Sequence, residues 1–170
     1  MPDVAEPTTR KDRYKSDSAA TADPSRHRGP TGLAEHACAP EAGAPDTWQV
    51  GLVLPADPAQ LPLARTVAVS VGATAALTVD RIDDLRQCVQ EALSLLLVSD
   101  GSGDLRLCYQ ATRGCVHVTA LRAWHGDPTG PAPVDEFSFA WLMLGELATE
   151  LSAQLIDGAL RVSFVIEASR

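Results

Sequence analysis

Few residues of this 170-residue chain have the type and spacing that catalysis or metal binding requires. No Cys-x-x-Cys pair occurs, and no histidine lies at metal-ligand spacing from another ligand, so we expect no metal site. The sequence contains no P-loop and no Gly-x-Ser-x-Gly nucleophile turn. His117 and His125 are isolated, and such histidines are more often surface or hydrogen-bonded residues than catalytic ones. The glycine-rich stretch at residues 100–103 is better explained as a loop between a helix and a strand than as a nucleotide loop.

The cysteines favour a structural role. Cys88 lies in a helical pattern, whereas Cys108 and Cys115 lie in strand patterns. The simplest interpretation is buried free thiols. A redox pair of Cys108 and Cys115, which would face each other across a hairpin, is the alternative.

The net charge of −8 is unevenly distributed along the chain. Residues 1–45 hold 6 basic and 7 acidic side chains, whereas residues 46–170 hold 8 and 15. An acidic body argues against direct nucleic-acid binding and is compatible with a basic protein partner. No apolar run approaches the roughly 20 residues of a membrane span, and the polar N-terminal stretch lacks the apolar centre of a secretory signal. We therefore expect a cytoplasmic protein that is not associated with a membrane.

Composition divides the chain into two parts. Residues 1–45 are rich in Ala, Pro, Thr, Ser and charge, and contain few large apolar residues. Such a segment cannot bury enough surface to offset its ordering entropy, which predicts a disordered tail. Residues 46–170 carry the apolar periodicity of one folded domain.

The expected elements of this domain alternate between strand and helix patterns. They are a strand at 48–54, a helix within 61–76, a helix at 79–98 that Thr78 caps, a hairpin turning at 112–114, a helix from about 135 to 155 that Gly158 ends, and a strand at 160–167. Phe137, Phe139 and Trp141 are expected mainly in the core, the alternative being one exposed aromatic that marks a binding surface. Helices that each bury one face imply an α/β two-layer sandwich, with a mixed sheet of four or more strands and three helices on one side.

Two helical stretches resemble the RsbW-type anti-sigma factors, which have the histidine-kinase-like ATPase fold. Residues 83–92 (DDLRQCVQEA) are similar to the DLRLAVDEA helix of that family. Residues 135–147 (DEFSFAWLMLGEL) are similar to the FSW-x-VL-x-AL helix of a divergent actinobacterial branch. Residues 55–58 and 63–65 are similar to the family's first strand-to-helix junction. The resemblance covers about residues 48–168, and it depends on the order and spacing of these stretches.

The resemblance implies a nucleotide site that this sequence does not complete. Typical members carry a Glu as general base and, four residues on, an Asn that holds Mg²⁺; here these positions are Glu91 and Leu95, and the chain contains no asparagine. The adenine-binding Asp of the family has its nearest counterpart in Asp127, for which a plain solvated turn is the alternative. The Gly-rich phosphate lid is replaced by residues 135–139, which begin with two acids. Glu91 is therefore the candidate catalytic residue and Asp127 the candidate cofactor-binding residue, with a solvated or capped acid as the alternative for Glu91.

Three functions follow from this reading. The resemblance implies an anti-sigma regulator that sequesters an alternative sigma factor, is relieved by a STAS-type anti-anti-sigma protein, and forms a homodimer. With the site degenerate, no cofactor is expected. The alternative is an active ATP- and Mg²⁺-dependent serine/threonine kinase that phosphorylates the anti-anti-sigma protein. A third interpretation is a sandwich domain with an unrelated partner, in which only the fold is shared.

Overall fold

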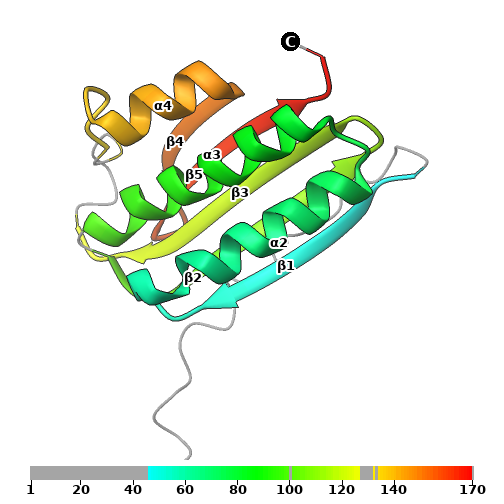
Figure 1. Cartoon of the computed structure of the whole chain (residues 1–170). Helices are drawn as coiled ribbons and strands as arrows, with labels where there is room; N and C mark the ends of the chain where they lie inside the picture. Colours follow the sequence, from blue (N-terminus) through cyan, green and yellow to red (C-terminus); the bar gives the residue numbers. More distant parts are fainter. Residues whose placement is uncertain (1–45, 100, 127–131, 133, 170) are drawn as a thin grey trace, which may run out of the picture.

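The structure is a computed structural model that describes residues 46–99, 101–126, 132 and 134–169. The expected disordered tail, residues 1–45, and the candidate adenine contact Asp127 both lie outside the described residues. The ordered part forms two layers: a sheet, and helices that cover one of its faces (Figure 1). The elements in chain order are β1 (Trp48–Leu54), the short 3₁₀ helix η2 (Pro58–Gln60), α2 (Leu61–Thr74), α3 (Val79–Val98), β2 (Gly101–Thr112), β3 (Cys115–Trp124), α4 (Phe139–Leu147), β4 (Thr149–Ile156) and β5 (Ala159–Glu167).

The sheet confirms the expected α/β sandwich and differs from it in detail. Its five strands follow the order β1-β2-β3-β5-β4, and every pairing between them is antiparallel. The expectation of a mixed sheet is therefore wrong. The strands β3 and β4, which α4 connects, run in the same direction, but β5 lies between them, so no two neighbouring strands are parallel.

The core lies between the sheet and the helices. Alternate residues of β2 face the helical layer, and Leu105, Leu107 and Tyr109 are almost completely buried there. The Tyr109 hydroxyl donates a hydrogen bond of 3.5 Å to the carbonyl oxygen of Ala64 in α2. From the helical side, α3 contributes Leu85, Val89 and other fully buried residues at helical spacing. The apolar residues that alternate along the hairpin and those that repeat at helical spacing in 79–98 therefore pack together in one core.

The long helix predicted for residues 135–155 is wrong in its second half. The helix α4 ends at Leu147, and β4 follows as an edge strand paired with β5. The two strands join at Asp157 and Gly158, which have φ of 51° and 73°. Asp-Gly with two positive φ values is a strong signal for a two-residue hairpin turn. The Asp157-Gly158 pair therefore indicates a hairpin turn between β4 and β5, and the expectation that Gly158 ends a helix is wrong.

The middle helix α3 is fixed at both ends. At its start, the Thr78 hydroxyl accepts a hydrogen bond of 3.4 Å from the backbone N–H of Arg81, which confirms the predicted cap. At its end, Arg122 Nη1 donates to the carbonyl oxygens of Leu96 and Leu97 at 2.8 and 3.3 Å. A cation at a helix C-terminus satisfies free carbonyls and complements the helix dipole.

Candidate functional site

Glu91 lies in the fourth turn of α3 and is nearly buried. Its residue is only 7% exposed, and one carboxylate oxygen accepts a hydrogen bond from the Gln87 side-chain amide one turn earlier. The structure therefore gives this candidate general base a local amide partner on its own helix. Of the alternative interpretation, a solvated or capped acid, the solvated form is wrong because Glu91 is nearly buried, whereas the bond from Gln87 is compatible with a capped acid.

The residue one turn after Glu91 is apolar and buried. Leu95 is 7% exposed and belongs to the hydrophobic core. Residues four apart on a helix lie on the same face, so Leu95 occupies the place from which an oxygen ligand would have to reach a Mg²⁺ ion near Glu91. A leucine supplies no oxygen. The residues present therefore do not fit a magnesium–nucleotide complex held in that way.

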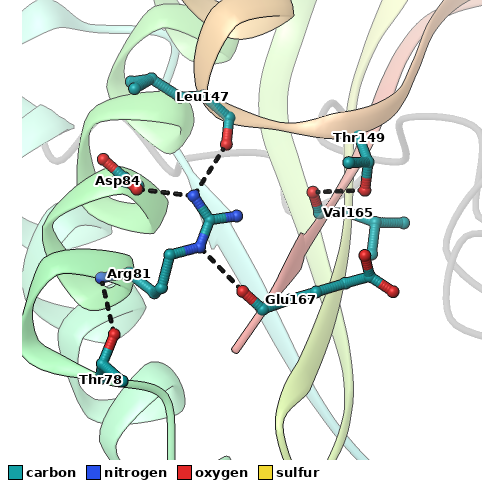
Figure 2. Close-up of polar contacts among 7 residues, drawn as sticks. All are labelled: Thr78, Arg81, Asp84, Leu147, Thr149, Val165 and Glu167. Atoms are coloured by element: carbon teal, nitrogen blue, oxygen red, sulfur yellow. Dashed lines mark hydrogen bonds and ion pairs between the residues drawn. The ribbon is translucent and has the colours of Figure 1, made fainter. Parts of the chain in front are cut away.

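The same face of α3 packs against α4 and the end of β5. Figure 2 shows the Arg81 guanidinium, whose Nε donates to the Glu167 carbonyl oxygen at 2.8 Å. Its Nη1 donates to Asp84 Oδ2 at 2.6 Å and to the Leu147 carbonyl oxygen, at the end of α4, at 3.2 Å. Arg81, Asp84, Glu91 and Leu95 follow the helical repeat, so they share one side of α3. That side is joined to α4 by the hydrogen bond from Arg81 to Leu147.

The lid region carries acids in place of glycines. Asp135 and Glu136 are exposed, and Asp135 accepts a hydrogen bond of 2.9 Å from the backbone N–H of Phe137. The helix α4 starts at Phe139, later than the expected position near 135, with Ser138 as its cap. Phosphate at a helix N-terminus needs free amides and no competing negative charge. Two exposed carboxylates beside the start of α4 are unfavourable for it.

Other chemistry-bearing residues form contacts that the sequence did not reveal. The His125 ring nitrogen Nε2 and the Ser102 hydroxyl are hydrogen-bonded to each other, and His125 is exposed. Among the residues that the structure describes, no carboxylate is bonded to the other ring nitrogen, so the arrangement that activates a serine nucleophile is incomplete there. A hollow of about 420 Å³ lies elsewhere, at the turn between β2 and β3, and does not include Glu91. It is lined by Asp46, Thr47, Trp48, Thr74, Ala76 and Arg113.

The alternative pairing of Cys108 with Cys115 is wrong, and so is the expectation of a free thiol at Cys108, because Cys108 is disulfide-bonded whereas Cys115 is free. In the β2–β3 register, Cys108 lies opposite Thr119, whereas Cys115 lies opposite Thr112 at the turn. The two cysteines are thus separated by several residues along the hairpin. Cys115 is a free thiol whose pKa is raised by burial and by the nearby carboxylates of Glu167 and Glu150. A raised pKa leaves less of the nucleophilic thiolate at neutral pH.

The expectation that Phe137 and Phe139 lie in the core is also wrong. Phe137 is 88% exposed and Phe139 is 71% exposed, while Trp141 is partly buried against the core. Leu142, one turn after Phe139, is also largely exposed. The alternative interpretation, an aromatic surface at the start of this helix, is the one that the structure supports.

Within the described part of the chain, no group of three or more His, Cys, Asp or Glu side chains is arranged to hold a metal ion. No helix in the same part is both long enough and apolar enough to cross a membrane.

Comparison with solved structures identifies the fold. The chain is similar to the crystal structure of the RsbU and RsbW domains of Rv1364c from Mycobacterium tuberculosis, with a TM-score of 0.55 and 12% sequence identity. The similarity covers 71% of this chain and 32% of the Mycobacterium chain, so this protein spans about a third of that structure's length. No protein-family profile matches the chain, and no curated protein matches it in sequence. The domain therefore shares an RsbW-like fold with part of that structure.

Proposed function

We propose that this protein is a cytoplasmic anti-sigma regulator that acts by binding and not by catalysis. It sequesters an alternative sigma factor and releases it when a STAS-type anti-anti-sigma protein competes for the same molecule. A homodimer is part of the proposal by resemblance to the family. No cofactor is required for this activity.

The observation that carries the proposal is the pair Glu91 and Leu95 on α3, in a fold that resembles RsbW. Glu91 is held by Gln87, and the position that would supply a magnesium ligand is a buried leucine. This helix lacks the oxygen that would position Mg·ATP, which supports a function that depends on binding a partner protein. The acidic body supports a protein partner over a nucleic-acid partner.

The second candidate function is a serine/threonine kinase that uses a divergent site. The observation in its favour is Glu91 itself, a nearly buried carboxylate at the position of the family's general base. Incubation with the cognate anti-anti-sigma protein and labelled ATP separates the two functions. We expect no label transfer from the wild-type protein. Transfer that Glu91→Ala abolishes and that Asp104→Ala, an exposed acid on β2, leaves intact would establish the kinase instead.

The experiment that tests the anti-sigma role is an affinity purification from lysate of the native host, with and without Mg·ATP, followed by mass spectrometry. We expect a sigma factor in both samples at equal abundance. Added STAS-type protein should then displace it from the column. Recovery of neither a sigma factor nor a STAS protein would contradict the proposal and leave the likeness as one of fold alone.

A further inference from the structure

Three large apolar side chains are exposed around the start of α4. Phe137, Phe139 and Leu142 are 88%, 71% and 58% exposed. Single exposed apolar residues are common on proteins, but two phenylalanines and a leucine within six residues form a group. We call these three side chains, together with the acids Asp135, Glu136 and Glu146, the α4 patch.

The local backbone places the members of the α4 patch near one another. Ser138 is the cap of α4, since its hydroxyl accepts a hydrogen bond of 3.3 Å from the Trp141 backbone N–H. Phe137 and Leu142 then occupy the two positions that pair in a hydrophobic staple. Phe139, Leu142 and Glu146 follow the i, i+3, i+7 spacing of one helix face. With 88% of its residue surface exposed, Phe137 is not hidden by such local packing.

The opposite face of α4 already has its partners. Leu144 is fully buried, and Trp141 and Leu147 pack against the core. The Leu147 carbonyl oxygen also accepts a hydrogen bond from Arg81 of α3. The helix is therefore fixed on the domain through its inner face, and its members of the α4 patch lie on the outer face. Figure 1 shows α4 beside α3, at one side of the helical layer.

The negative charge of the α4 patch limits which partner could bind there. Asp135, Glu136 and Glu146 are exposed, and none forms an ion pair with any residue that the structure describes. The sequence contains no Lys, Arg or His between residues 126 and 160. A second copy of this chain would bring acid against acid, which disfavours self-association through this surface.

We infer that the α4 patch is a docking surface for an amphipathic helix whose apolar stripe is flanked by Arg and Lys. The apolar stripe covers Phe137, Phe139 and Leu142, and the basic flanks pair with the acidic rim. The inference rests on the proposed function, because it treats the protein as a binder of another protein, and it adds the surface and the chemistry of the bound segment.

The test uses the full-length protein and three fluorescein-labelled peptides of about 18 residues, long enough for a helix to present several anchors. The first peptide has Leu at helical spacing and Arg on the flanks. The second replaces Arg by Glu, and the third replaces Leu by Ser. We expect fluorescence anisotropy to show binding of the first peptide alone.

Matched variants assign that binding to the α4 patch. The double variant Phe137→Ser, Phe139→Ser should bind the first peptide with an affinity that is lower by roughly tenfold or more, as loss of aromatic anchors does in other interfaces. The double variant Asp135→Asn, Glu136→Gln should lower the affinity for the first peptide less, and should make that affinity less dependent on salt. The control is Val79→Ser with Val98→Ser, which removes apolar side chains that are 75% and 83% exposed on α3 and should leave the affinity unchanged.

Several outcomes would overturn the inference. Equal binding of the third peptide, or unchanged affinity in the phenylalanine variant, would mean general attraction to an acidic protein. A dimer in sedimentation experiments that the phenylalanine variant dissociates would make a second copy the occupant. A sigma factor captured equally by wild type and that variant would preserve the proposed function and place its contact elsewhere.

A different result separates the inference from the proposed function. Peptide binding at the α4 patch without any captured sigma factor would support the docking surface and contradict the anti-sigma role.

Discussion

Tyr109 is the buried tyrosine of the core, and its hydroxyl lies against the backbone of α2. Burial raises the pKa of Tyr109 well above the ordinary value of 10.0, because the phenolate would lose its hydration. Its neighbour, the Ala64 carbonyl oxygen, can only accept a hydrogen bond and so favours the protonated form. The folded state therefore binds this proton more tightly than the unfolded state does.

Because the pKa of Tyr109 is higher in the folded than in the unfolded state, the protein should lose stability at high pH. The stabilisation that neutral Tyr109 adds to the free energy of unfolding is complete below pH about 10, the pKa of tyrosine in the unfolded chain. It is lost as pH rises above that value. At pH 10.5 the loss should be about 0.8 kcal/mol of the free energy of unfolding. Urea denaturation at pH 8 and pH 10.5 measures it, and Tyr109→Phe should show the smaller decrease. An equal decrease in both proteins would contradict the assignment.

Absorbance offers an independent check of the same residue. The chain has two tyrosines, and Tyr14 lies in the N-terminal segment outside the described residues. In a Tyr14→Phe variant, only Tyr109 contributes to phenolate absorbance. We expect no titration step near pH 10 while the protein remains folded. A step at that pH in the folded variant would show that the phenol is accessible to water.

At the scale of elements, Arg81 joins α3, α4 and β5. One guanidinium reaches the carbonyl oxygens of Leu147 and Glu167 as well as Asp84 (Figure 2). The Arg81 side chain is 9% exposed, and its Nη2 has no hydrogen-bond partner among the described residues. The planar, forked guanidinium suits three acceptors from three directions in a way that an ammonium does not.

Arg81→Met should destabilise the domain by about 1–3 kcal/mol, because it leaves two carbonyl groups and the partly exposed Asp84 carboxylate without their donor. The matched control is Arg86→Met on the same helix. Arg86 pairs with Asp83 at the same i, i+3 separation, but the two side chains are 37% and 62% exposed. An exposed pair of this kind contributes less than about 1 kcal/mol. Urea denaturation of both variants measures the difference, and equal losses would contradict the role assigned to Arg81.

At the scale of the whole molecule, the proposal predicts that nucleotide leaves stability unchanged. A ligand at 100 times its dissociation constant raises the free energy of unfolding by about 2.7 kcal/mol. We expect millimolar Mg·ATP to leave the melting temperature where it is, with Mg·GTP as the control for ionic effects. A rise specific to Mg·ATP would show that α3 and its surroundings bind the nucleotide despite Leu95.

Much of the fold followed from local patterns. The period of residues 79–98, the Thr78 cap and the alternation around the 112–114 turn each depend on interactions within a few residues, and the structure confirms all three. The strand β4 was missed because Leu147, Leu151 and Leu155 also fit a helical period. Its Asp-Gly turn and its pairing with β5 decide between the two, and that pairing is a contact between different segments.

For the candidate site, the sequence by itself determined which ligands could exist. A chain without asparagine, with Leu95 one turn after Glu91, cannot present an asparagine oxygen to Mg²⁺ in any conformation, because composition alone excludes it. Only the tertiary structure decided how these residues are surrounded. It placed Glu91 against Gln87, joined the Arg81 side of α3 to α4, and left Phe137 and Phe139 on the surface. Burial depends on which elements pack together, and a single apolar stripe does not specify which of its residues the rest of the chain will cover.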